Sequence, residues 1–139
     1  MNTVSIGKAS LAALALAGAA LAGGCTTAYS KVDGNFDMPT TELNDYPVRV
    51  VAVDGQFQAH NDALVEPGMH TLVVTSRKPS IFRIHEQKAV GFEVEPCTHY
   101  YLAARHPGKL DEHWELVVRK TEPMPGCDMA RAMSMIKQG

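Results

Sequence analysis

Short apolar runs separated by turn residues fill the chain from Tyr46 onward, and this pattern constrains the fold more than any other feature. The strand-like runs, rich in Val and aromatic residues, are 46–54, 63–77, 80–87, 89–96, 98–105 and 113–120. Asp54-Gly55 is a strong hairpin-turn signal, and Pro67-Gly68 suits a type II turn between two apolar runs. Turn signals spaced every 8 to 12 residues or so favour an all-β sandwich or barrel.

Alternation within these runs supports half-buried strands. In the run 89–96, Val90, Phe92 and Val94 alternate with Gly and Glu, which is the period of a strand with one buried face. In the run 113–120, Trp114, Leu116 and Val118 lie on one face of the expected strand. Only the tail 127–139 is rich in helix formers, and so short a segment is marginal as an isolated helix.

Two segments of this region resemble the PEGA motif of bacterial envelope proteins. VRVVAVDG at 48–55 and VEPGMHTLVV at 65–74 carry the resemblance, and YYLAA followed by Trp114 is similar to a hairpin of small lipoproteins. The resemblance spans roughly 48–118 and implies a small antiparallel β-sandwich of the prealbumin-like type. No enzymatic activity comes with it.

The N-terminus has the three-part layout of a secretory signal. A short polar region ending in Lys8 precedes the apolar run ASLAALALAGAALA at 9–22, and Gly23 and Gly24 follow. A transmembrane helix needs about 20 predominantly apolar residues, and this run is shorter and rich in Ala and Gly. We therefore expect residues 1–24 to be a signal peptide.

Cys25 directly follows these small residues, and LAGGC at 21–25 resembles the lipobox of bacterial lipoproteins. The resemblance implies that Cys25 is diacylglycerated on sulfur, that the signal is cut just before it, and that the new amino group is acylated. Two or three acyl chains hold a protein stably on a membrane, whereas one holds it only marginally. The resemblance also implies a sorting rule, in which Asp just after the Cys retains the protein in the inner membrane; Thr26 stands there, so the expected location is the outer membrane of a Gram-negative host, facing the periplasm.

The region 25–45 begins with the Cys25 that the resemblance implies is lipidated, and few large apolar side chains and no sustained periodicity predict a linker after it. A coil of about 20 residues would span on the order of 25 Å. The β-sandwich domain is then expected at 46–139. Tyr29 and Phe36 leave open the alternative that part of the linker packs on the domain or adds an edge strand.

If Cys25 carries lipid, Cys97 and Cys127 remain as a pair in an oxidising compartment, where a disulfide is expected. Cys97 stands just before the run 98–105, and Cys127 follows the run 113–120 and a short loop. If these runs form a hairpin, the two cysteines come close together, which a disulfide requires.

The charge and motifs exclude several function classes. A formal net charge of -2 without a long basic block argues against nucleic-acid binding. The sequence contains no GxSxG elbow and no glycine-rich phosphate loop. We therefore expect a protein that is not an enzyme and needs no cofactor.

A polar turn at 106–113 gathers His106, Asp111, Glu112 and His113, and the candidate metal ligands among them are His106, Asp111 and His113. Imidazole and carboxylate groups together can hold a divalent metal. Turns also collect polar residues because they are solvated, and the chain has no HExxH motif. The sequence thus predicts no metal site, with these three residues as the candidates if one exists.

Two functions follow from these expectations. The first is a membrane-anchored envelope lipoprotein with a non-catalytic β-sandwich that binds an envelope protein or serves as a structural or accessory part of an envelope assembly. Its candidate interface aromatics are Tyr100, Tyr101 and Trp114, although Trp114 also suits the core. The second is a lipoprotein that binds a small ligand: a carbohydrate, a cell-wall fragment or a metal.

Overall fold

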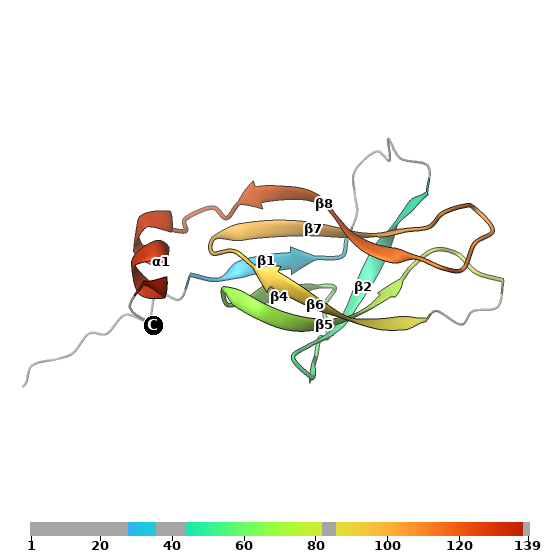
Figure 1. Ribbon diagram of the computed structural model, residues 1–139, viewed down its shortest axis with the longest axis horizontal. Coiled ribbons are helices and arrows are strands. Elements are labelled where there is room, and N and C mark those ends of the chain that lie inside the picture. Colours follow the sequence, from blue (N-terminus) through green and yellow to red (C-terminus); the bar gives the residue numbers. More distant parts are fainter. Residues whose placement is uncertain (1–27, 36–43, 82–85, 138–139) are drawn as a thin grey trace, which may run out of the picture.

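The computed structural model describes residues 28–35, 44–81 and 86–137 and confirms the all-β architecture (Figure 1). The strands are β1 (Ser30–Asp33), β2 (Asp45–Val53), β3 (Gln56–Phe57), β4 (Asp62–Val65), β5 (Gly68–Ser76), β6 (Gln87–Val94), β7 (Thr98–Arg105) and β8 (Glu115–Pro123). One short helix, α1 (Met129–Ile136), follows the last strand. Cys25 lies outside the described residues.

Strand β2 belongs to both layers of the sandwich. Its first residues, Asp45–Pro47, pair with the end of β7, and its later residues, from Val48 on, pair with β5. Layer A contains β4, β1, β7 and β8, and layer B contains β3, β2, β5 and β6. A register shift between Val50 and Ala52 marks a bulge within the part of β2 that belongs to layer B. The two layers are therefore one sheet that folds over along β2.

Strand β1 corrects the linker predicted for 25–45, because it lies inside layer A between β4 and β7. Ser30 is fully buried, and its Oγ donates to the carbonyl of Glu95 at 2.5 Å and accepts from the Thr98 amide at 2.9 Å. The domain thus includes residues well before Tyr46. The sequence concealed this strand because its four residues contain a single large apolar side chain, Val32.

The pairing of β1 with β7 is parallel, whereas the other strand pairings in the described structure are antiparallel. The sheet is therefore mixed, which differs from the purely antiparallel sandwich that the sequence predicted. A parallel neighbour is possible here because β1 reaches β7 from the N-terminal side of the domain rather than through a hairpin.

The core lies between the two layers. Its fully buried large side chains come from β1, β2, β5 and β7: Val32, Val48, Val50, Leu72, Val74 and Leu102. Apart from Leu102, which is followed by buried Ala103, each of these residues alternates with more exposed neighbours, as the period of a strand requires.

Two glycines lie where the backbone geometry requires them: Gly55 in the turn after β2, and Gly34 where the chain after β1 packs against β2. Gly55 and Asp54 both have positive φ, 79° and 49°, and form the predicted hairpin turn between β2 and β3 as a type I′ turn requires. Gly34 lies against β2 so closely that a Cβ atom there would meet the carbonyl oxygen of Val48 at 2.3 Å. Only glycine fits this approach of β1 to β2.

Gly68 has a positive φ of 130°, but the strands on either side of Pro67-Gly68, β4 and β5, lie in different layers. This turn therefore carries the chain from layer A to layer B. Of the strand expected at 80–87, residues 82–85 lie outside the described residues, while Ser80, Ile81 and Glu86 are not in a strand; β6 begins at Gln87.

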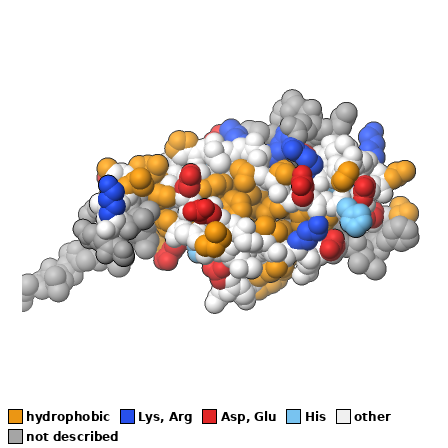
Figure 2. Space-filling view, viewed as in Figure 1, with side chains coloured by type: hydrophobic (Ala, Val, Ile, Leu, Met, Phe, Trp, Pro, Cys, Tyr) orange, Lys and Arg blue, Asp and Glu red, His pale blue; other side chains and the backbone are white. Residues whose placement is uncertain are grey.

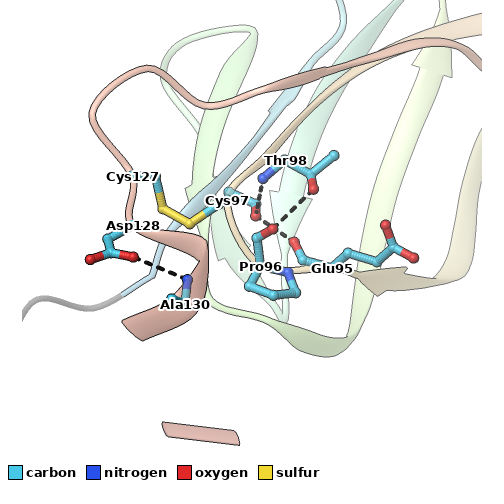
Figure 3. The surroundings of a disulfide bond; sticks show 8 residues. Glu95, Pro96, Cys97, Thr98, Cys127, Asp128 and Ala130 are labelled. Carbon is cyan, nitrogen blue, oxygen red and sulfur yellow. Dashed lines mark hydrogen bonds between the residues drawn. A yellow bond between two sulfur atoms is a disulfide. The ribbon is translucent and has the colours of Figure 1, made fainter. Parts of the chain in front are cut away.

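The predicted hairpin of 98–105 with the next run is confirmed as β7 and β8, with Thr98 opposite Pro123. This register brings the two cysteines together: the amide of Met124 donates to the carbonyl of Cys97 at 2.8 Å. Cys97 and Cys127 lie at disulfide distance, with Cα atoms 5.6 Å apart (Figure 3). The geometry that the sequence predicted for this pair is confirmed.

Helix α1 begins directly after the cysteine pair. The carboxylate of Asp128 accepts a hydrogen bond from the amide of Ala130 at 3.0 Å, which is the geometry of an N-cap (Figure 3). The cap and the neighbouring cysteine pair together hold a helix that would be marginal in isolation.

Candidate binding surface

Two of the three candidate interface aromatics are core residues. Tyr100 is 6% exposed and Trp114 is 5% exposed. Tyr101 points to the outer side of layer A, where its ring stacks on His99 with centroids 4.1 Å apart. Its hydroxyl donates to the Glu122 carboxylate at 2.9 Å, which raises the pKa of Tyr101 above its usual value. Of the three, only Tyr101 is available to a partner.

The candidate metal ligands are not brought together as a site. Both ring nitrogens of buried His106 are engaged: Nε2 lies 2.8 Å from Ser76 Oγ, and Nδ1 lies 2.9 Å from the carbonyl of Asp111. The Asp111 carboxylate accepts from the amide of His113 at 2.9 Å. Among the residues that the structure describes, no group of three or more His, Cys, Asp or Glu side chains is placed to hold a metal ion.

The pair of Ser76 and His106 was not foreseen, because the two residues lie 30 positions apart. Each is only 2% exposed, and Ser76 Oγ also accepts from the amide of Lys78 at 3.2 Å. Burial lowers the pKa of His106 most strongly, which favours a neutral imidazole. A substrate cannot reach a serine oxygen enclosed in this way, so the pair fixes the loop 106–113 rather than forming a nucleophile.

A buried carboxylate ties the start of β2 to β7 and β8. Asp45 Oδ1 and Oδ2 lie 2.9 and 3.0 Å from Nε and Nη2 of Arg105, and Oδ2 lies 2.5 Å from Nη1 of Arg119. These hydrogen bonds, of which the one from Arg105 has the largest effect, hold the pKa of Asp45 below its usual range. A groove of about 840 Å³ lies beside this cluster, lined by Asn44, Asp45, Arg105, His106, Pro107, His113, Trp114 and Glu115.

The sandwich is open along one side, between β6 and β8. In the described structure, β6 pairs only with β5, and β8 pairs only with β7, so each keeps a free edge. Val118 lies opposite buried Leu102, and Leu116 lies opposite buried Ala104, so both β8 side chains face the interior side of layer A. Val118 is nevertheless 45% exposed. Layer B therefore does not fully cover β8.

We call this surface the open side and define it by four apolar residues, Val90, Phe92, Leu116 and Val118. Hydrophobic side chains gather in the middle of the face shown in Figure 2, between the positions of β6 and β8 in Figure 1. The first three of these residues are partly buried against the core.

Two contacts bridge the layers at the ends of the open side. At one end, Lys88 Nζ donates to the carbonyl of Trp114 at 2.5 Å and lies 5.0 Å from the centre of its ring. At the other, the hydroxyl of Tyr100 accepts from the amide of Glu95 at 2.8 Å, and its ring packs edge-on against Phe92. Between these contacts the open side is apolar, and the free backbone edges of β6 and β8 border it.

The outer face of layer B offers a second exposed apolar set. Strand pairing aligns Phe57, Ala52, Val73 and Ala89 in one row across this face. Phe57 and Met69 are each 70% exposed. On β6 this face presents Ala89 and Gly91 between the polar residues Gln87 and Glu93, so its apolar surface is interrupted there.

Comparisons with known proteins found no match: no protein-family model, no curated protein and no solved structure is similar to this chain. Within the residues that the structure describes, no helix has the length and apolar character needed to span a bilayer.

Proposed function

We propose that this chain is a membrane-anchored envelope lipoprotein whose β-sandwich is non-catalytic and binds an extended segment of a protein partner at the open side. The lipobox resemblance at 21–25 supports the anchor on Cys25. Thr26 supports sorting to the outer membrane, facing the periplasm. The partner is an envelope protein in the same compartment.

The exposure of Val118 is the observation that carries this proposal. An inward-facing Val at 45% exposure means that apolar surface of the sandwich interior is left in contact with water. A strand added to the free edge of β6 would extend layer B over the inner side of β8 and cover this surface. Its backbone would pair with β6, and its alternate side chains would contact Val118 and Leu116.

This geometry specifies the partner's chemistry. The segment is extended, has apolar side chains at alternate positions on the side facing β8, and carries no charge there. Lys88 and the bond between Glu95 and Tyr100 mark the two ends of the available edge. The segment is therefore about as long as β6, which has eight residues.

The alternative of a small ligand has less support. A carbohydrate site uses exposed aromatic faces, but Tyr100 and Trp114 are buried, and the ring of Tyr101 is stacked on His99. A metal site was expected to include His106 as a ligand, but both ring nitrogens of His106 already have hydrogen-bond partners.

Site-specific photo-crosslinking in the native host tests the proposal. A photoreactive phenylalanine analogue replaces Val118 in one variant and Met69 in the other; Met69 is more exposed than Val118 but lies on the outer face of layer B. We expect an adduct from position 118 and none from position 69, with the crosslinked partner peptide showing apolar residues at alternate positions. Recovery of the chain alone from both variants, or equal adducts from both, would contradict the proposal.

A separate measurement tests the anchor. Mass spectrometry of the N-terminal peptide should show lipid on Cys25 of the wild type, and the same peptide of Cys25→Ser should carry no lipid adduct. A wild-type chain without a lipid adduct would disprove lipidation.

A further inference from the structure

The start of the ordered domain lies close to the proposed lipid attachment point. Ser30 is held inside layer A, so only residues 26–29 connect it to Cys25. At about 3.6 Å per residue, this connection spans at most about 18 Å even when fully extended. This inference rests on the proposed anchoring at residue 25 and replaces the long linker expected from the sequence.

The same end of the domain carries α1. Ser30 Oγ contacts the amide of Thr98, the residue after Cys97. Cys97 lies at disulfide distance from Cys127, and α1 begins at Met129 (Figure 3). Figure 1 shows α1 beside the start of β1, while the loop between β7 and β8 lies at the opposite end of the domain. The anchor and α1 therefore share one end of the molecule.

Helix α1 presents apolar side chains to the surroundings at this end. Met129 and Met133 are 53% and 51% exposed, and their spacing of four residues places them on one helix face. The sequence from 129 to 137 contains two basic residues and no carboxylate, and the carboxylate of the preceding Asp128 is engaged in capping the helix. Exposed apolar side chains on one face, with basic residues among the polar ones, are typical of helices that lie in a membrane interface.

The dimensions allow contact. The headgroup region on each side of a bilayer is about 5 to 7 Å thick, and a helix with its side chains is about 10 to 12 Å across. A connection of at most about 18 Å therefore keeps α1 within reach of the headgroups. Because the N-cap and the cysteine pair already hold α1 in place, docking would not require the helix to form first.

We propose that α1 docks on the bilayer surface beside the anchored Cys25, with Met129 and Met133 directed into the lipid. The domain then stands with the cysteine pair next to the membrane and the loop 106–113 farthest from it. The open side, which runs along β6 and β8 between these ends, remains accessible from the periplasm.

Fluorescence quenching by brominated lipid tests this orientation. The full-length gene is expressed in a Gram-negative host, and the chain is extracted from the envelope and reconstituted into vesicles that contain brominated phospholipid. Two variants each add one tryptophan: Met133→Trp in α1, and Leu110→Trp in the distal loop, where Leu110 is 97% exposed. Buried Trp114 gives the same background signal in both.

We expect brominated lipid to remove most of the fluorescence that Met133→Trp adds and none of that added by Leu110→Trp. Since both positions are exposed, neither substitution should unfold the domain. Backbone amides of α1 in the unsubstituted protein should also exchange more slowly on vesicles than in residues 26–139, which lack both the signal and Cys25. Equal quenching of both variants, no quenching of Met133→Trp, or unchanged exchange in α1 would each overturn the docking proposal.

The outcome is separable from a failure of the lipid anchor. A chain that kept residues 1–24 as an uncleaved apolar segment would still hold residue 25 at the membrane surface, and quenching would still report on α1. The mass spectrum of the Cys25 peptide reports on lipidation alone. The vesicles contain lipid and no partner protein, so quenching in them identifies the bilayer as the surface that α1 contacts.

Discussion

Reduction of the Cys97–Cys127 pair should destabilise the domain by an amount that the chain separation sets. The two cysteines are 30 residues apart. For a closed loop of this size, the chain-entropy model gives a loss of about 3.6 kcal/mol at 25 °C, because the reduced unfolded chain regains the freedom that the cross-link removed. With urea m values of about 1 to 3 kcal/mol/M, the unfolding midpoint should fall by about 1 to 4 M.

The measurement is equilibrium urea unfolding of residues 26–139, with and without a reductant. The single tryptophan, Trp114, is buried and therefore reports on unfolding through its fluorescence. The double variant Cys97→Ser/Cys127→Ser is the control, since its midpoint should not respond to the reductant. Counting thiols in the denatured protein verifies that reduction occurred.

Two results would refute this reasoning. An equal thiol count before and after reduction would show that the pair is not oxidised, despite Cα atoms only 5.6 Å apart. An unchanged midpoint after confirmed reduction would show that the cross-link does not restrict the unfolded chain, and that the contacts of β7 with β8 hold this end of the domain without it.

Two further predictions concern the contacts that join β1 and β2 to the sheet. Gly34→Ala should lower the melting temperature, because its Cβ would lie 2.3 Å from the Val48 carbonyl oxygen, whereas Gly108→Ala, with nothing within 4 Å, should leave it unchanged; equal melting temperatures would contradict the close packing. Asp45→Asn should cost about 1.5 to 3 kcal/mol in urea unfolding at neutral pH, because it removes the charge of a buried carboxylate that accepts hydrogen bonds from Arg105 and Arg119. The hydrogen bond from Arg105 lowers the pKa of Asp45 in the folded protein more than burial raises it. The wild type should therefore lose this stabilisation as the pH falls through that lowered pKa. The variant should lack this part of the acid sensitivity, and parallel pH profiles would disprove the role of Asp45.

Several local elements could be predicted from residues next to each other in the chain. The run 98–105 has the length and composition of a strand, and it is β7. Asp54-Gly55 forms its turn because both residues tolerate positive φ. The proximity of Cys97 and Cys127 could be predicted from the expected hairpin. One cysteine precedes its first strand and the other follows its second, so both lie at the end opposite the turn.

The candidate site was predicted less well, because burial depends on the opposite layer. Alternation places Tyr100 and Tyr101 on opposite faces, but only the folded sheet shows that Tyr100 faces the core. His106 is polar and stands at a turn, yet Ser76 on β5 encloses it. The exposure of Val118 has no signature in the sequence, since it reflects how far layer B reaches over β8.

The sequence by itself determined the approximate positions of strands β2, β5, β6, β7 and β8, the tight turn at Asp54-Gly55 and the placement of Cys97 beside Cys127, because these depend on neighbours within a run or a hairpin. Only the tertiary structure decided that Ser30–Asp33 is an interior strand, that the connection to Cys25 is short, and that one side of the sandwich is open. Strand β1 obtains its partners from β4 and β7, both distant in the chain. Such pairing arises from the packing of the whole sheet, so four residues with one large apolar side chain could not reveal it.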